Sequence, residues 1–182
     1  MSLENIVIWP DKRLSEICLP FTAWDDESST SQLGSLITWM TNTMWEAGGI
    51  GIAAPQVGSS LRVICWKVDE TKDAYNDGCL VNPVIEFQQD VAMVAEEGCL
   101  SFPGLSVPVS RPGGIIVTGK SPHGEDRRIE AKGLLARVIQ HEIDHLNGIT
   151  LADKMGKLKR ELWKKRLTKW KDKYDHDNYP DE

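Results

Sequence analysis

The chain has 182 residues, of which 41% are hydrophobic and 26% charged, and its formal net charge at pH 7 is −6. This length is enough for one hydrophobic core of ordinary size, so we expect a single folded domain. The sequence has no internal repeat, no low-complexity block and no apolar run of membrane-spanning length, which excludes fibrous and transmembrane classes. We expect neither a membrane partner nor specific DNA binding.

The first periodic segment is residues 28–47, which opens with a Ser/Thr cluster and repeats apolar side chains at helical spacing. The apolar positions are Leu33, Leu36, Ile37, Met40 and Met44. A glycine pair, Gly48 and Gly49, follows directly and predicts the end of a helix.

Short runs typical of β-strands come next, separated by proline, glycine and aspartate. They are Leu61–Lys67, Cys79–Ile85, Val91–Ala95, Leu105–Val109, Gly114–Gly119 and Arg127–Ala131. Because several short strands accompany few helices, we expect an α+β fold. Mostly antiparallel strands would form small sheets around a central helix, with an N-terminal and a C-terminal helix beside them.

The four cysteines show no Cys-x-x-Cys spacing, and we expect no signal peptide ahead of them, so a disulfide framework is disfavoured. Cys18, Cys65 and Cys79 lie in apolar runs and are interpreted as buried small hydrophobic residues. Cys99 differs because it follows two acids and a glycine. Its local setting leaves core packing and metal ligation equally open.

The segment after the strands, His141-Glu142-Ile143-Asp144-His145, is typical of a metal site. Side chains four residues apart on an α-helix lie about 40° apart on one face, so both imidazoles can point at one ion. Glu142 falls in the same arc, where a carboxylate can take a proton from metal-bound water. The alternative is a charged helix face that happens to carry two histidines. Only 4 histidines occur in the chain, which favours the metal site.

The helix that carries this motif has an apolar face. Leu134 and Val138 precede the two histidines on one stripe and are expected to form an apolar wall beside the ion. Arg137 lies at the edge of this face, and we expect it to extend outward to solvent. Gly148 follows the last periodic residue and predicts the C-cap.

An H-E-x-x-H pair needs a third protein ligand. The metzincin pattern would place a histidine at position 151, which is Leu151. His123 lies in a Ser-Pro-His-Gly turn and His176 in a polar tail, and both are poor settings for a rigid ligand. A cysteine or carboxylate upstream is then required, and residues 96–101 offer both.

Three segments, in order, resemble the signature motifs of peptide deformylases. Residues 49–56, Gly-Ile-Gly-Ile-Ala-Ala-Pro-Gln, resemble the first motif, G-φ-G-φ-A-A-x-Q. Residues 97–101, Glu-Gly-Cys-Leu-Ser, match the second, and residues 140–145, Gln-His-Glu-Ile-Asp-His, match the third. The resemblance covers about residues 5–155. It implies a metal-dependent hydrolase that removes the formyl group from formylmethionine at the start of nascent polypeptides and releases formate.

The resemblance also implies a role for each matching residue. The metal ligands would be Cys99, His141 and His145, with Glu142 as the general acid and base. The Gln56 side-chain amide and the Leu100 backbone N–H would hold the oxyanion. Residues that line or hold the formylmethionyl peptide would be Ile50, Gly51, Glu97, Gly98, Arg111, Leu134 and Val138.

The same resemblance implies one divalent metal ion as cofactor. Ferrous iron is the ion expected in the cell, and Zn²⁺, Ni²⁺ or Co²⁺ are alternatives in purified protein. It further implies a cytoplasmic location, in a bacterium or under the direction of a phage acting within one.

The C-terminal part has a different charge balance from the rest of the chain. Residues 154–173 hold ten Lys/Arg and two acids. Their apolar positions, Leu158, Leu162, Trp163, Leu167 and Trp170, predict an amphipathic helix. Either this helix packs its apolar stripe on the catalytic domain, or its basic face also tethers the protein to the ribosome, an RNA-rich surface. The expected division is a catalytic domain over 1–153, the basic helix over 154–173 and a disordered acidic tail over 174–182.

Two other functional classes remain open at this point. A metallopeptidase with the same H-E-x-x-H site would cleave internal peptide bonds without releasing formate. An inactive relative would serve as a ribosome-binding or peptide-binding module and should have lost a metal ligand or Glu142. None of these residues is lost.

Overall fold

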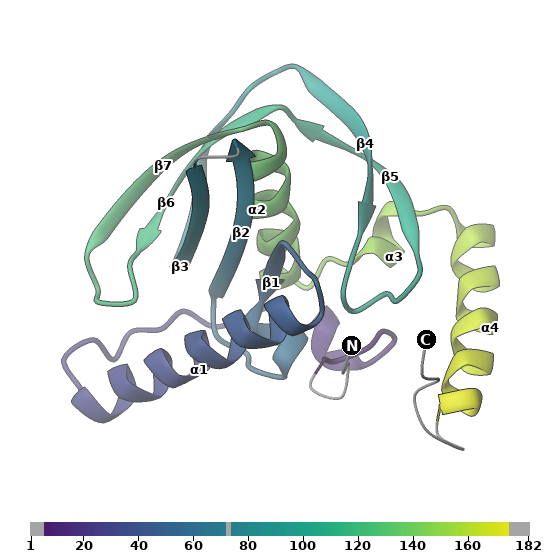
Figure 1. Ribbon diagram of the computed structural model, residues 1–182, viewed down its shortest axis with the longest axis horizontal. Coiled ribbons are helices and arrows are strands. Elements are labelled where there is room, and N and C mark those ends of the chain that lie inside the picture. Colours follow the sequence, from purple (N-terminus) through teal and green to yellow (C-terminus); the bar gives the residue numbers. More distant parts are fainter. Residues whose placement is uncertain (1–5, 72–73, 175–182) are drawn as a thin grey trace.

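The computed structural model describes residues 6–71 and 74–174 (Figure 1). The elements are, in order, η1 (Lys12–Ser15), α1 (Glu27–Glu46), β1 (Gly51–Ala53), η2 (Ala54–Val57), β2 (Val63–Thr71), β3 (Ala74–Gln88), β4 (Ala92–Gly98), β5 (Ser106–Pro112), β6 (Gly114–Lys120), β7 (Asp126–Lys132), α2 (Gly133–Leu146), α3 (Leu151–Lys154) and α4 (Lys157–Tyr174). The expected α+β fold, with small sheets and helices at both ends, is confirmed.

The strands form two antiparallel sheets. One has five strands in the order β1-β2-β3-β6-β7, and the other pairs β4 with β5. In Figure 1 the central helix α2 lies between the five-stranded sheet and the β4–β5 pair, while α1 crosses below the strands. This arrangement gives α2 a neighbour on each side, and the site residues on it are enclosed.

Each face of the five-stranded sheet packs against its own helix. Because side chains alternate along a strand, Ile64 and Cys65 of β2 point to opposite faces. Ile64 joins a cluster with Leu135 and Ile139 of α2. Cys65 joins a second cluster with Met40 of α1. The core therefore has two layers, and the sheet lies between α1 and α2.

The hairpin of β2 and β3 extends further than the sequence pattern indicated. The pairing continues to Thr71 and Ala74, whereas the predicted runs ended at Lys67 and began at Cys79. Residues 69–73 are mostly polar, so they lack the apolar alternation by which strands are recognised.

Helix α2 ends as its glycine predicted. Gly148 has φ +71°, a left-handed conformation that suits glycine. Its N–H donates to the carbonyl of His145 at 3.1 Å, and Ile149 N–H donates to that of Asp144 at 2.9 Å. This pair of hydrogen bonds is the Schellman arrangement, which satisfies the last carbonyls of the helix beside the two histidines.

Helix α4 packs on the rest of the protein through two of its apolar residues. Trp163 and Leu167 are buried, and the Trp163 ring lies 5.0 Å from Phe102 and 5.5 Å from Trp9 between centroids. The single apolar stripe expected for this helix is wrong in part, because Leu158 and Leu162 are exposed. Their position follows from helix geometry, since five residues span about 500° and leave Leu158 about 140° away from Trp163.

Two expectations concern parts of the chain that the structure leaves out. The side chain of Trp170 belongs to the last turns of α4, where side chains are not described. Most of the acidic tail, residues 175–182, lies outside the described residues. Among the described helices, none combines the length and apolar character that crossing a membrane requires.

Replacing Trp163 with alanine should lower the free energy of unfolding by about 3–5 kcal/mol, because it removes a buried ring in contact with two others. Denaturant titration followed by circular dichroism measures the change. Leu158→Ala is the matched control on the same helix, and its exposed side chain predicts a small effect. Equal effects of the two substitutions would show that α4 does not dock in solution.

Candidate metal centre

The two histidines of α2 point toward the same region, with ring centroids 5.1 Å apart. Both side chains are buried, as is Glu142 between them. His141 Nδ1 lies 3.0 Å from Oε2 of Glu97, which leaves Nε2 for another partner. His145 presents Nε2, because that atom lies 3.2 Å from Sγ of Cys99.

Cys99 approaches the histidines from a different part of the fold. It follows the last residue of β4 and begins a turn in which its carbonyl accepts a hydrogen bond from Phe102 N–H at 2.9 Å. The ligand atoms of Cys99, His141 and His145 all lie within 4.8 Å of one another. The structure thus brings together the three residues that the sequence proposed as metal ligands.

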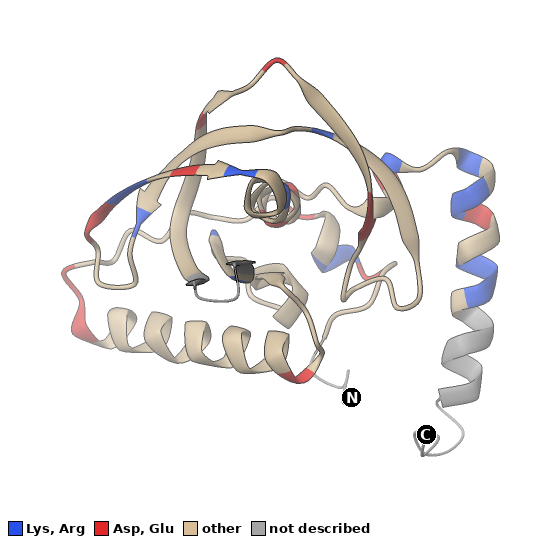
Figure 2. Ribbon diagram, turned by 45° about the horizontal axis from the view of Figure 1, so that its top comes forward, with Lys and Arg blue, Asp and Glu red and all other residues tan. Residues whose placement is uncertain are grey.

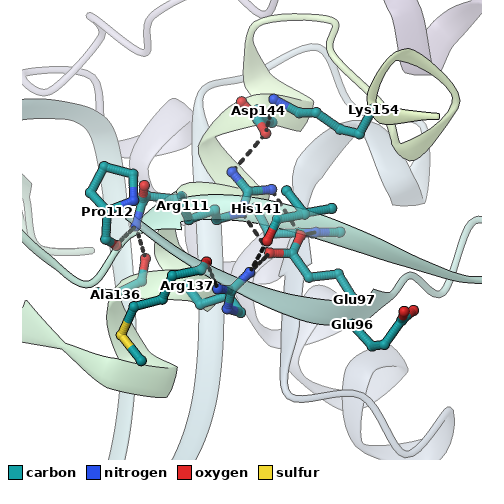
Figure 3. Close-up of polar contacts among 12 residues, drawn as sticks. Glu96, Glu97, Arg111, Pro112, Ala136, Arg137, His141, Asp144 and Lys154 are labelled. Atoms are coloured by element: carbon teal, nitrogen blue, oxygen red, sulfur yellow. Dashed lines mark hydrogen bonds and ion pairs between the residues drawn. The ribbon is translucent and has the colours of Figure 1, made fainter. Parts of the chain in front are cut away.

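Glu97, two residues before Cys99, connects β4 to α2 and β5 (Figure 3). Its carboxylate accepts from Arg111 Nε at 2.6 Å and Arg111 Nη2 at 2.9 Å, in addition to the contact with His141. Burial opposes ionisation of this group, but the hydrogen bonds from His141 and Arg111 outweigh it and lower the pKa of Glu97 to about 2. The carboxylate is therefore charged at neutral pH and holds the His141 ring.

Arg111 does not line the cavity itself but lies behind Glu97. Its Nη1 is 2.9 Å from Oδ2 of Asp144, and Lys154 Nζ is 3.0 Å from the same oxygen. A chain of hydrogen bonds and ion pairs therefore runs from His141 through Glu97, Arg111 and Asp144 to Lys154 of α3. Buried charges need such partners, since an uncompensated one is costly.

The expectation that Arg137 extends to solvent is wrong. Its side chain is only 13% exposed, and Nη1 lies 2.6 Å from Oε1 of Glu97. It also donates to the backbone carbonyls of Val109 at 2.9 Å and Met93 at 2.6 Å. These acceptors come from β4 and β5, which the helix pattern alone could not place. One feature of the sequence could have indicated this position: Arg137 is four residues before His141, so the two side chains lie on the same face of the helix.

Glu142 has the electrostatic setting of an acid–base catalyst. Burial raises the pKa of this carboxyl to about 7, although His141 and Arg111 partly oppose the rise. Its Oε2 atom is buried without a hydrogen-bond partner among the described residues. Gly51 lies so close that a Cβ at that position would collide with Glu142 Oε1. A glycine is therefore needed for β1 to approach the carboxyl.

Gln56 presents its amide nitrogen to the site. Its Oε1 accepts from Ala53 N–H at 2.8 Å, which orients the side chain. The Nε2 atom lies 3.5 Å from Cys99 Sγ and 3.3 Å from Ser101 Oγ. Leu100 follows Cys99 in the turn and also lines the cavity.

These groups surround one cavity of about 610 Å³. The predicted residues that line it are Ile50, Gly51, Gln56, Glu97, Gly98, Cys99, Leu100, Leu134, Val138, His141 and Glu142. His145 and Arg111 lie behind this wall and border a smaller space. Arg137, Phe102 and Leu105 also line the large cavity and were not among the predicted site residues.

The donor set fits a divalent metal ion. A thiolate and two imidazoles are ligands that borderline metals such as zinc and iron accept. The electrostatics agree: burial alone would lower the pKa of His141, but hydrogen bonds with Cys99 and Glu97 raise it well above its usual value. Surroundings that favour a positive charge on this ring also favour a cation beside it. His145 Nδ1 has no hydrogen-bond partner among the described residues, and it is Nε2 that faces the Cys99 sulfur.

Comparisons with known proteins agree over most of the chain. The family described as Polypeptide deformylase matches residues 3–161. The peptide deformylase of Thermodesulfovibrio yellowstonii is 47% identical over 167 residues, which cover 92% of this chain and 98% of that protein. The crystal structure of a peptide deformylase from Legionella pneumophila aligns with a TM-score of 0.84 at 37% identity, covering 95% of this chain and 98% of that one. The enzyme from Ehrlichia chaffeensis, solved in complex with actinonin, aligns with a TM-score of 0.82 at 36% identity, covering 93% and 98%.

Arg137→Met should weaken the affinity for Zn²⁺ or Co²⁺ by about 10- to 100-fold, the usual cost of losing a group that orients a ligand. The substitution keeps a long side chain but removes the hydrogen bonds to Glu97 and to the β4 and β5 carbonyls. Competition with a chromophoric chelator measures the affinity. Arg128→Met, at an exposed position on β7, is the matched control. Unchanged affinity in Arg137→Met would show that Glu97 keeps its place without this contact.

Proposed function

The chain belongs to the peptide deformylase family, and from that premise we propose how its own residues perform the metal-dependent removal of the formyl group from formylmethionine at the start of nascent polypeptides. The observation that carries the proposal is the convergence of Cys99, His141 and His145 beside Glu142 and Gln56 in one cavity. Formate and a free amino terminus are the products.

The residues that would hold the metal ion are Cys99, His141 and His145. When bound, a divalent ion supplies Lewis acidity and lowers the pKa of a coordinated water to about 7. Glu97 contributes by accepting from His141 Nδ1, which selects the tautomer with a lone pair on Nε2. Arg111 and Arg137 keep Glu97 in that position.

Glu142 would act as the base that takes the proton of the attacking water. A carboxyl with a pKa of about 7 can accept a proton and also give it up near neutral pH. The same proton would then pass to the nitrogen of the methionine, which cannot leave as an anion. Burial of Glu142 thus supplies both halves of the proton transfer.

Gln56 and Leu100 would stabilise the oxygen of the formyl group as charge develops on it. The Gln56 amide nitrogen is already oriented by the hydrogen bond from Ala53 N–H to its oxygen. The Leu100 N–H lies in the adjacent turn. Each donor aimed at such an oxyanion contributes about 3 kcal/mol to transition-state stabilisation.

The peptide would bind along the outer edges of two strands. Strand β1 is at the edge of the five-stranded sheet, and β4 pairs with β5 in the two-stranded sheet. Ile50 and Gly51 at one edge and Gly98 at the other line the cavity, so an extended peptide can form main-chain hydrogen bonds that are independent of its side chains. Leu134 and Val138 would contact the methionine side chain. This mode suits an enzyme that accepts many different nascent chains.

We propose ferrous iron as the ion in the cell. One thiolate with two neutral imidazoles leaves a divalent centre with a net charge of +1, and this mixed donor set suits a borderline metal. An iron–thiolate site would be sensitive to oxygen, because Cys99 can be oxidised stepwise once the ferrous ion has been oxidised. Metal analysis of protein purified with and without oxygen tests the assignment.

Glu142→Ala should keep its metal and lose at least about 100-fold in turnover, since it removes the proton-transfer group. Cys99→Ala should lose both metal and turnover. The assay uses anaerobically purified protein with a formyl-Met dipeptide while formate is measured.

Two other outcomes would favour a different function. Cleavage of an internal bond in a blocked peptide, without release of formate, would favour a metallopeptidase. Metal binding without any turnover by the unaltered protein would favour an inactive binding module.

We further propose that α4 binds the ribosome, which would place the protein in the cytoplasm. Figure 2 shows Lys and Arg along the described turns of this helix, whereas basic and acidic positions are mixed over the rest of the fold. Trp163 and Leu167 hold one side of α4 against the protein, and Lys165 and Arg166 are exposed. A basic surface of this kind binds phosphate-rich RNA in a salt-dependent manner.

Replacing Lys157, Lys165 and Arg166 with glutamine should weaken ribosome binding and reduce its dependence on salt, by about one unit of log–log slope per lost phosphate contact. Co-sedimentation with ribosomes over a range of salt concentrations measures both. Neutralising Arg127 and Arg128 of β7 is the control. If the α4 variant binds ribosomes like the unaltered protein at low salt, the helix serves only to pack on the domain.

A further inference from the structure

Two cysteines outside the metal centre face each other across neighbouring strands. Cys65 of β2 and Cys79 of β3 are direct partners in the register of the hairpin. Neither belongs to the Cys99, His141 and His145 group, and the function proposed above makes no use of them. A pair of thiols on adjacent strands can react together, which a single buried thiol cannot.

The backbone hydrogen bonds of the sheet show whether Cys65 and Cys79 form a hydrogen-bonded or a non-hydrogen-bonded cross-strand pair. Asn82 N–H donates to the Arg62 carbonyl at 2.7 Å, so these two residues form a hydrogen-bonded pair. The register continues without a shift through Val63–Val81 to Cys65–Cys79. Hydrogen-bonded pairs therefore fall at the even-numbered positions of β2. Pairs alternate along an antiparallel ladder, which makes Cys65–Cys79 a non-hydrogen-bonded pair.

The pairing of β2 with β1, on its other side, leads independently to the same assignment of the Cys65–Cys79 pair. Lys67 N–H donates to the Ile50 carbonyl at 2.9 Å, and Ile52 is the partner of Cys65 in the β1–β2 register. The backbone groups of Cys65 therefore point toward β1 and away from β3. Its side chain meets Cys79 where the two backbones have no bond between them.

Non-hydrogen-bonded pairs are those in which cross-strand side chains approach most closely. Their Cα atoms lie about 4.5 Å apart, which falls within the range of about 4.4–6.8 Å found for disulfides. The backbone of the folded protein therefore already holds the two cysteines at a separation that a disulfide can bridge.

The surroundings of the pair allow one sulfur to be reached and keep the other protected. Cys65 is 1% exposed and lies in the cluster beneath α1, while Cys79 is half-buried at its margin. The Cys65 thiol and burial together raise the pKa of the Cys79 thiol well above its usual value. Cys79 is consequently a thiol at neutral pH, and its oxidation requires an external oxidant.

We propose that Cys65 and Cys79 are an oxidation site that closes to an intramolecular disulfide in the presence of a hydroperoxide. The Cys79 sulfur first attacks one peroxide oxygen, so an S–O bond forms, the O–O bond breaks, and the products are a sulfenic acid and water or an alcohol. The Cys65 sulfur then displaces the hydroxyl group, which leaves as water, and the S–S bond forms. In total, two thiols lose two protons and two electrons, and these reduce one peroxide O–O bond to water and an alcohol or to two water molecules.

The disulfide would add a covalent link between β2 and β3, next to the strand β1 that borders the cavity. Closing the loop between residues 65 and 79 restricts the unfolded chain, so the oxidised protein should unfold at a higher temperature than the reduced protein. This chemistry is separate from oxidation of Cys99, which would remove a metal ligand. The two events can therefore be distinguished in one sample.

The test exposes the zinc-loaded full-length protein to hydrogen peroxide, blocks the remaining thiols with iodoacetamide in denaturant, and maps the peptides by mass spectrometry. The expected product is a cross-linked peptide that contains Cys65 and Cys79 and lacks two hydrogen atoms. It should be absent from Cys65→Ala and from Cys79→Ala. It should persist in Cys18→Ala, the control for a buried cysteine in another part of the core. Melting curves before and after oxidation, and after reduction with dithiothreitol, should show a rise in unfolding temperature that is reversible.

Two results would overturn the proposal. One is full alkylation of both Cys65 and Cys79 after peroxide treatment that has already oxidised Cys99 in the same molecules. The other is a cross-link that joins either residue to Cys18, to Cys99 or to a second chain.

Discussion

The buried carboxylate of Glu97 is the contact on which the geometry of the metal centre depends. It lies two residues before Cys99 on β4 and reaches His141 on α2, Arg111 on β5 and Arg137 on α2. The ligands come from two elements that are not adjacent in the chain, and this one charged group fixes their relative position. Because a buried charge without partners is strongly destabilising, the three cationic or hydrogen-bonding neighbours and the carboxylate stabilise one another in a single arrangement. Loss of any one of them leaves the others with an uncompensated cost.

Most of the site could be predicted because its information is local in the chain. The spacing of His141, Glu142 and His145 determines their common face as soon as a helix is assumed, and the glycine at position 148 ends that helix where the pattern indicated. Cys99 was different. Its neighbours in the sequence allowed either packing or ligation, and only the resemblance to a family favoured ligation before the fold placed its sulfur against His145. The identity of a ligand that comes from another element depends on the tertiary structure, which helix periodicity does not contain.

The errors have a common physical origin in partners that lie far away along the chain. Arg137 was expected in solvent because nothing in its own helix could accept its hydrogen bonds, yet the carbonyls of β4 and β5 do so. Strand β1, with only three residues, is too short to show an alternating pattern and exists because β2 pairs with it. In α4, the hydrophobic residues were assigned to one stripe, whereas among the described side chains of this helix Trp163 and Leu167, on the side that meets Trp9 and Phe102, are the buried ones. Local patterns identify which elements form, and long-range contacts decide which of their faces are covered.

Two carboxyls of the same cavity show how environment assigns different tasks to the same chemical group. Both Glu97 and Glu142 are buried, and burial by itself raises the pKa of each. Arginine and histidine donors reverse the effect at Glu97, bringing its pKa to about 2, whereas Glu142 keeps an oxygen without a hydrogen bond and has a pKa of about 7. Leaving a buried acceptor unpaired costs about 1–3 kcal/mol, so folding alone would favour a partner for Glu142. The absence of one among the described residues is best explained by chemistry, because a carboxyl that is already hydrogen-bonded would be a weaker base. The hydrogen-bond donors thus gather on Glu97, which contacts the His141 ring, and not on Glu142, which we propose as the group that exchanges a proton.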